Sequence, residues 1–130
     1  PPHPAPPACL LACPPAAAFA APTGAADREP GPRVVLSSLR SMGNGRAMIV
    51  GHTDGLVKVV AAKEPDGRAG RILGVNLVGP WVTEQISQGY MAVNWEATVD
   101  EVAAFIQPHP TFSELFGETV LSLTGRSLHG

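Results

Sequence analysis

The sequence predicts an α+β domain in which helices pack on one face of an antiparallel sheet. Between residues 34 and 78, short β-branched or alternating apolar runs are separated by turn residues, as expected of strands. After Gly79-Pro80, the apolar spacing changes from about two residues to about 3.6, the period of a helix. A chain of 130 residues has room for one domain with a modest core.

Residues 1–32 differ in composition from the rest of the chain. They hold most of the 14 prolines, many alanines and few larger apolar side chains. Proline fixes φ and lacks an amide donor, so this composition disfavours both helices and sheet ladders. We therefore predict that residues 1–32 are disordered and that the folded domain covers residues 33–130. Because the chain opens on Pro1-Pro2 without a methionine, we also expect a fragment of a longer protein.

Three strands are predicted in the first half of the domain, at residues 34–36, 56–60 and 72–78. Gly43-Asn44-Gly45 is typical of a turn, because glycine and asparagine tolerate positive φ. Pro65-Asp66-Gly67 provides another turn between the second and third strands. These two strands are therefore expected to form an antiparallel hairpin with a long loop.

Three helices are predicted after the strands. The first runs from about Val82 to Trp95, and the second begins at Thr98, which forms a capping-box pattern with Glu101. Two prolines end the second helix, and the third runs from about Thr111 to Gly125. The residues expected to face the core are Val82, Ile86, Tyr90 (or Gly89), Val93, Val99, Val102, Ala103, Ile106, Phe112, Leu115, Phe116, Val120 and Leu123.

Charge and cysteine content argue against several classes of function. The net charge is −2 and the charges are scattered, so we expect neither nucleic acid nor a membrane as partner. No apolar run approaches the roughly 20 residues of a membrane span. Cys9 and Cys13 indicate no disulfide framework, and we expect a cytoplasmic protein. His3, His52 and His129 lack metal-ligand spacing, so no metal site is predicted.

One segment, residues 107–114, combines residue types suited to catalysis. His109 lies between two prolines and Glu114 follows five residues later. A carboxylate that accepts one imidazole N–H fixes the tautomer and leaves the other nitrogen free to act as a general base. Thr111 and Glu114 also fit a capping box, however, which would make Glu114 a helix cap and His109 an ordinary loop residue. The spacing alone leaves both interpretations open.

The same segment predicts one unusual backbone feature. The trans preference of an X-Pro bond is only about 0.5–1 kcal/mol, so Pro110 could hold the His109–Pro110 bond in the cis form. The large aromatic residues, Trp81, Tyr90 and Trp95 among them, are expected in the core or at a dimer interface.

The segment from His109 to Glu114, HPTFSE, resembles the H-P-T-x-S-E signature near the C-terminus of dihydrolipoamide dehydrogenases and related pyridine nucleotide-disulphide oxidoreductases. The resemblance covers about residues 33–130. It continues through residues 43–47, 54–59, 71–75, 78–79, 93–97 and 117–129. Residues 93–97 and the C-terminal tail look like those of actinobacterial dihydrolipoamide dehydrogenases.

This resemblance implies an interface domain that pairs two identical subunits. In the family, a His-Glu pair reaches into the partner subunit's active site, where FAD and a redox disulfide accept electrons from dihydrolipoamide and pass them to NAD. Dihydrolipoamide is carried by 2-oxo acid dehydrogenase complexes. By this resemblance, His109 is the general base that takes a thiol proton and Glu114 orients it.

The sequence also departs from the family. The Gly-rich fingerprints for FAD and NAD are absent, so we expect this chain alone to bind neither cofactor and to be inactive. Cys9 and Cys13 are separated by three residues rather than the family's four, and Gln107 stands where the family often has histidine. The extended opening of the interface domain has no counterpart in residues 1–32, so the sheet is expected to lack its first elements. Two alternatives remain, a non-catalytic dimerisation module and the interface domain of a glutathione, mercuric or transhydrogenase-type reductase.

Overall fold

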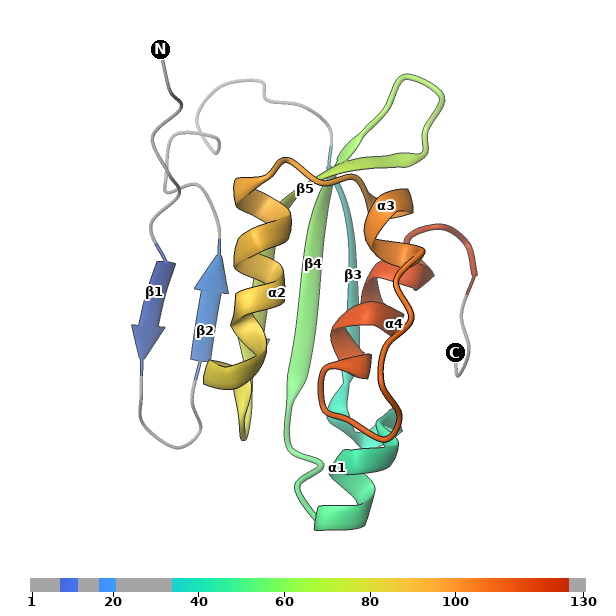
Figure 1. Cartoon of the computed structure of the whole chain (residues 1–130). Helices are drawn as coiled ribbons and strands as arrows, with labels where there is room; N and C mark the ends of the chain where they lie inside the picture. The colour runs from blue at the N-terminus through green and yellow to red at the C-terminus, as the bar shows by residue number, and fades with distance from the viewer. Residues whose placement is uncertain (1–7, 12–16, 21–33, 127–130) are drawn as a thin grey trace.

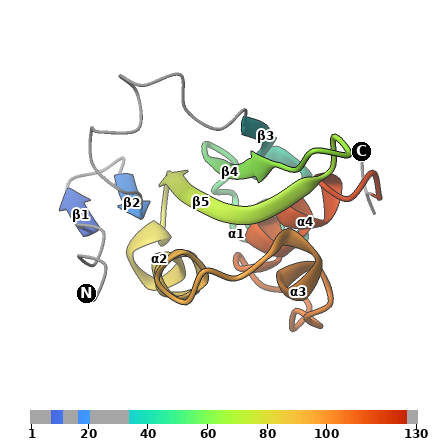
Figure 2. The same ribbon diagram turned by 90° about the horizontal axis from the view of Figure 1, so that it is seen from above.

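The computed structural model describes residues 8–11, 17–20 and 34–126. Five strands form one antiparallel sheet in the order β1-β2-β5-β4-β3. Figure 1 shows α2, α3 and α4 on one face of this sheet, and the view in Figure 2 shows sheet and helices as two layers. The predicted α+β architecture is therefore confirmed. The elements are β1 (Ala8–Leu11), β2 (Ala17–Ala20), β3 (Val34–Arg40), a 3-10 turn (Ser41–Gly43), α1 (Gly45–Val50), β4 (Leu56–Lys63), β5 (Ala69–Val78), α2 (Val82–Asn94), α3 (Val99–Ala103) and α4 (Glu114–Ser122).

The centre of the sheet is the predicted hairpin. Strands β4 and β5 pair from Leu56 opposite Val78 to Lys63 opposite Ala69. Their connection is closed by hydrogen bonds between the Glu64 N–H and the Arg68 carbonyl and between the Gly67 N–H and the Glu64 carbonyl. Strand β3 pairs with the other edge of β4 and extends four residues beyond the predicted end at Leu36, to Arg40.

The N-terminal part of the chain differs from the prediction. Residues 1–32 were expected to be disordered, but Ala8–Leu11 and Ala17–Ala20 are strands, and β2 pairs with β5. These two strands extend the sheet beyond β5; the other positions of residues 1–32 lie outside the described residues, and the predicted domain boundary at residue 33 stays a prediction. Neither segment contains proline, so each retains the amide donors that an edge strand needs. Cys9 lies in β1, whereas Cys13, His3 and His129 lie outside the described residues.

The core lies between the helix-bearing face of the sheet and the three covering helices. Helix α2 approaches β5 closely at Gly89, where an added Cβ would lie 2.8 Å from Cγ1 of Val75. The buried apolar residues are Val57, Val59, Ala61, Ile72, Val75 and Leu77 of the sheet and Val82, Ile86, Ala92, Val93, Val99, Val102, Leu115, Phe116 and Val120 of the helices. Most residues predicted to face the core are in this list, and Tyr90, Ala103 and Leu123 pack against it half-buried.

Two helices are shorter than predicted. Helix α3 ends at Ala103, and the chain then runs alongside α4 towards α1 (Figure 1). Ile106 lies on this outer segment and is 97% exposed, so its predicted place in the core is wrong. Helix α4 begins at Glu114 rather than at Thr111. No helix within the described residues is long and apolar enough to cross a membrane.

Candidate functional site

The loop between α3 and α4, residues 104–113, carries the predicted site. It reaches the end of the molecule where α1 lies (Figure 1). The His109–Pro110 bond at its tip is cis, which confirms that prediction. The His109 ring lies beside the first residue of α1, because a Cβ added to Gly45 would be 3.8 Å from His109 Cε1.

His109 and Glu114 are in direct contact. The distance between His109 Nδ1 and Glu114 Oε1 is 2.8 Å. The histidine side chain is 74% exposed, whereas the glutamate side chain is 18% exposed. A carboxylate can only accept, so this bond places the proton of the neutral ring on Nδ1. The Nε2 atom is then the nitrogen free to accept a proton.

The other oxygen of Glu114 is bound to the backbone. Glu114 Oε2 accepts a hydrogen bond of 2.7 Å from the Thr111 N–H. This is one half of the predicted capping box. The Thr111 hydroxyl donates to the Pro108 carbonyl at 2.7 Å and accepts from the Ser113 hydroxyl at 3.2 Å rather than completing the box with the Glu114 N–H. Glu114 therefore holds the loop with one oxygen and the imidazole with the other, and the two interpretations of its spacing are compatible.

Asn44 is the residue of this site that the sequence analysis missed. It is buried, and it caps α1 by accepting a 2.9 Å hydrogen bond from the Ala47 N–H through Oδ1. Its Nδ2 donates to the Thr111 carbonyl at 2.9 Å. The segment 43–45 was predicted to be only a turn. An asparagine directly before Gly-Arg-Ala-Met is also an N-cap signal, which could have indicated α1 but not the contact with Thr111.

Gln107 occupies the position at which the family often has histidine. It is half-buried, and its Nε2 lies 3.3 Å from Gln88 Oε1 on α2 as a donor. Its side chain also lies against Gly117 of α4, where an added Cβ would be 2.7 Å from Gln107 Cγ. Gln107, which precedes His109 in the loop, therefore contacts both α2 and α4.

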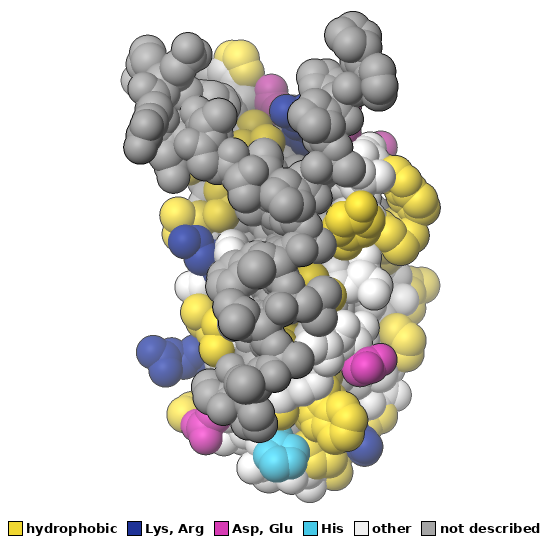
Figure 3. Space-filling view, turned by 90° about the vertical axis from the view of Figure 1, so that its left-hand side faces the viewer, with side chains coloured by type: hydrophobic (Ala, Val, Ile, Leu, Met, Phe, Trp, Pro, Cys, Tyr) yellow, Lys and Arg dark blue, Asp and Glu magenta, His cyan; other side chains and the backbone are white. Residues whose placement is uncertain are grey.

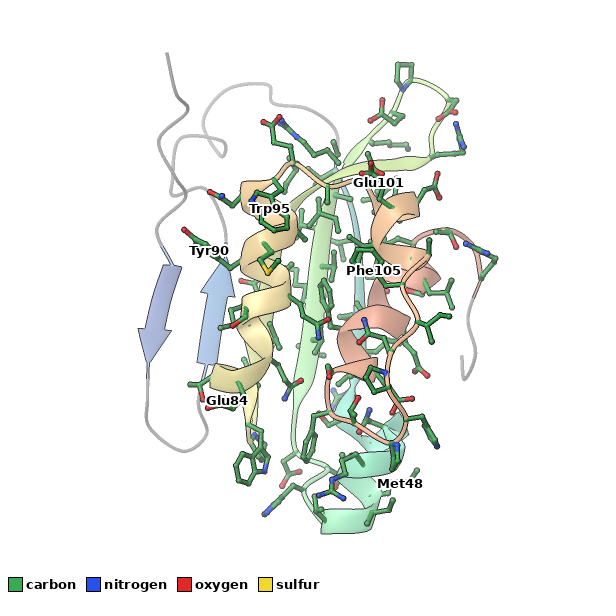
Figure 4. All side chains as sticks on the ribbon, in the orientation of Figure 1. Met48, Glu84, Tyr90, Trp95, Glu101 and Phe105 are labelled. Carbon is green, nitrogen blue, oxygen red and sulfur yellow. The ribbon has the colours of Figure 1, made fainter. Side chains whose placement is uncertain are left out.

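A second feature is an apolar groove of about 840 Å³ beside the loop. Trp95 at the end of α2 and Phe105 after α3 lie on facing sides of it (Figure 4), and Glu101 is the only charged residue among the described residues that line it. Trp95 is 69% exposed and Phe105 66%. Hydrophobic side chains also line the helix-bearing edge of the face in Figure 3, with only a few charges between them. The large aromatic residues were predicted to lie in the core or at a dimer interface. Because Trp95 is exposed, the core position is wrong for this residue.

The described residues contain no Gly-rich loop of the dinucleotide-binding type. Gly43-Asn44-Gly45 is their nearest match to a Gly-rich loop, but it connects β3, an antiparallel edge strand, to α1. A dinucleotide fingerprint instead lies between a parallel strand and a longer helix. In the same part of the chain, no three His, Cys, Asp or Glu side chains are grouped to hold a metal ion.

Comparisons with known proteins identify the family of this domain. Residues 7–120 match the family model of the pyridine nucleotide-disulphide oxidoreductase dimerisation domain, and this match includes β1 and β2. A dihydrolipoyl dehydrogenase of Bacillus subtilis is 37% identical over 98% of this chain and 27% of its own length. One from Zymomonas mobilis is 43% identical over 78% of this chain and 21% of its own length.

The fold recurs in solved structures. The crystal structure of LpdA from Mycobacterium tuberculosis matches with a TM-score of 0.77 and 24% identity, over 89% of this chain and 24% of that protein. The resemblance to actinobacterial dihydrolipoamide dehydrogenases stays a prediction.

The chain spans about a quarter of the length of the relatives that it matches. The match to the family model shows that the chain belongs to the dimerisation-domain family of the pyridine nucleotide-disulphide oxidoreductases.

Proposed function

We propose that this chain is the interface domain of a dihydrolipoamide dehydrogenase and supplies the general base for oxidation of dihydrolipoamide. The observation that carries the proposal is the 2.8 Å contact between His109 Nδ1 and Glu114 Oε1 on an exposed loop. The names of the relatives support dihydrolipoamide as the substrate class. FAD and NAD would be bound by domains outside this chain, and 2-oxo acid dehydrogenase complexes and a cytoplasmic setting belong to the same proposal.

The proposed chemistry requires only a proton acceptor from this chain. His109 Nε2 takes the proton of a dihydrolipoamide thiol, which leaves a thiolate and a protonated imidazole. The thiolate then attacks a disulfide of the partner subunit, and one sulfur of that disulfide leaves as a thiolate. Glu114 stabilises the protonated ring and keeps Nε2 facing outward. Because the ring is exposed on a loop tip, a site on another subunit can reach it.

A chimera tests this proposal. The chain would replace the corresponding C-terminal part of the Bacillus subtilis relative, and dihydrolipoamide oxidation by NAD would be measured. His109→Gln is expected to lower kcat by roughly 10²–10⁴-fold, the usual effect of removing a general base. His52→Gln is the matched control, because His52 is exposed and lies outside the loop. Equal and small effects of the two variants would refute the base role.

We also propose that the groove side of the domain forms the contact with the second subunit. Support comes from Trp95, Phe105 and Ile106, which are large, apolar and exposed around one groove. Exposed apolar patches of this kind are typical of protein interfaces. Family membership supports a homodimer rather than a different partner.

Sedimentation of charge variants tests the location of this contact. Phe105→Asp is expected to lower self-association of the chain, because a buried, unpaired carboxylate opposes interface formation. Met48→Asp is the control, since Met48 is also exposed but lies on α1. A dimer that tolerates Phe105→Asp as well as Met48→Asp would place the interface elsewhere.

A further inference from the structure

We infer that Asn44 and Gly45, at the start of α1, are positioning residues for the His109–Glu114 pair. This inference rests on the proposed base role of His109. Asn44 is among the few buried polar residues, and both ends of its amide are bonded, one to Ala47 and one to Thr111. Neither residue forms a hydrogen bond with Glu114, so any effect on the pair acts through the loop backbone and the imidazole ring.

The residue type at position 44 is required by its two partners. The Ala47 N–H can only donate, so it must meet Oδ1, and the Thr111 carbonyl can only accept, so it must meet Nδ2. Aspartate has no donor for the carbonyl. Serine can cap the helix equally well, but its side chain is too short to serve both partners. Among small side chains, only asparagine makes both bonds from this place.

Thr111 transmits the contact to the catalytic pair. Its carbonyl is held by Asn44 and its N–H is held by Glu114 Oε2. The remaining oxygen of Glu114 meets His109 Nδ1. Asn44 therefore fixes the backbone of Thr111. This backbone orients the Glu114 carboxylate, which in turn sets the tautomer of the His109 ring.

Gly45 acts on the ring itself. The 3.8 Å separation between an added Cβ and His109 Cε1 is an ordinary van der Waals contact, so alanine fits. A β-branched side chain adds two carbons to this Cβ, and we expect one of them to press on the ring. Gly43 has no atom within 4 Å of an added Cβ, which makes it a matched control on the same segment.

Nitrogen NMR of the 130-residue chain tests the inference. Long-range couplings to the His109 ring nitrogens are expected to show one neutral tautomer, with the proton on Nδ1. Asn44→Ser retains the helix cap and should convert this tautomer into a mixture. Gly45→Val should do the same by displacing the ring, while Gly43→Val should leave the spectrum unchanged. Circular dichroism shows whether each variant is folded. If Asn44→Ser does not fold, Gly45→Val still tests the inference.

The same variants in the chimera separate this inference from the proposed function. A shift of about 1 Å in a reacting group can cost on the order of 10²-fold in rate, so Asn44→Ser and Gly45→Val should lower kcat about ten- to a hundredfold with little change in KM. Loss of activity in His109→Gln, with unchanged tautomer and kcat in Asn44→Ser and Gly45→Val, would overturn the positioning role alone. Full activity in His109→Gln would overturn the base role and the inference with it.

Discussion

Glu114 shows how one side chain can serve both a helix terminus and a reactive group. A carboxylate has two oxygens in one plane, so binding Oε2 to the Thr111 N–H restricts where Oε1 can lie. Here Oε1 meets His109 Nδ1. The helix cap therefore also orients the imidazole, and loss of the cap would be expected to release the ring.

At the same scale, Gly117 determines where Gln107 can lie. We expect Gly117→Ala to displace Gln107, because the new Cβ would lie 2.7 Å from Gln107 Cγ. The contact between Gln107 and Gln88 should then be lost. Alanine also gains up to about 1 kcal/mol in helix propensity, which offsets the strain, so the free energy of unfolding should change by less than about 1 kcal/mol. The side-chain amide resonance of Gln107 and a denaturant titration measure the two effects.

Gly43→Ala provides the comparison, since nothing lies near that position. An unchanged Gln107 amide resonance in Gly117→Ala would show that Gln107 does not need a glycine at position 117 to pack against α4. The activity of the corresponding chimera would show whether the Gln107 contact matters for His109.

Single residues were predictable from the sequence where the information was local. Two prolines and a cap pattern singled out the segment of His109 and Glu114, and the resemblance of HPTFSE to a family signature implied their roles. Asn44 was not found, because its partner Thr111 is 67 residues away and a Gly-Asn-Gly segment has the same composition whether or not it anchors a distant loop. The long-range contact therefore needs the fold.

Among the elements, α3 has the most explicit sequence signal and the clearest dependence on pH. Glu101 Oε2 accepts hydrogen bonds from the Thr98 N–H and the Thr98 hydroxyl, both at 2.8 Å, and the Thr98 hydroxyl also accepts from the Glu101 N–H. The backbone bond, followed by the hydroxyl bond, holds the pKa of Glu101 below its ordinary value of 4.5. The predicted capping box is confirmed.

We expect this box to stabilise α3 less as the pH falls. A lowered pKa in the folded chain means that the stabilisation is complete above the ordinary value of 4.5 and is lost as the pH falls through the lower, folded value. The Thr98 amide resonance should therefore shift below about pH 4.5, and the protection factors of the α3 amides, which correct for the slower intrinsic exchange in acid, should fall in the same range. Thr98→Ala removes both bonds that involve the side chain, so its α3 should exchange faster at neutral pH. Identical exchange in the variant and the unmutated chain would show that the box does not stabilise the helix.

Whole elements were predicted where burial leaves a periodic pattern. Strands β4 and β5 and helix α2 each have one buried side, so their apolar spacing indicated them. Helix α1 has only Ala47 buried, and Met48 and Ile49 are exposed, so it has no apolar stripe to detect. The N-terminal strands were missed because each has four residues and lies in a proline-rich segment.

On the scale of the whole molecule, a single copy of the chain leaves large apolar side chains exposed to water. Trp95, Phe105 and Ile106 are exposed around the groove, although each would be stabilised by leaving water. The base role proposed for His109 likewise places its reaction partner, a redox disulfide, on the other subunit. Both features fit a domain that functions across a subunit boundary.

Mixed dimers of the chimera test this dependence between subunits. One subunit would carry His109→Gln with intact redox cysteines, and the other would carry intact His109 with those cysteines replaced by serine. Each homodimer should be nearly inactive. Random reassociation should restore about a quarter of the unmutated activity, because about half of the dimers are mixed and each of these holds one complete site, as two-fold symmetry requires. If the mixture stayed as inactive as its parents despite confirmed exchange of subunits, His109 would serve its own subunit, and the contact surface proposed around Trp95 and Phe105 would have no catalytic purpose.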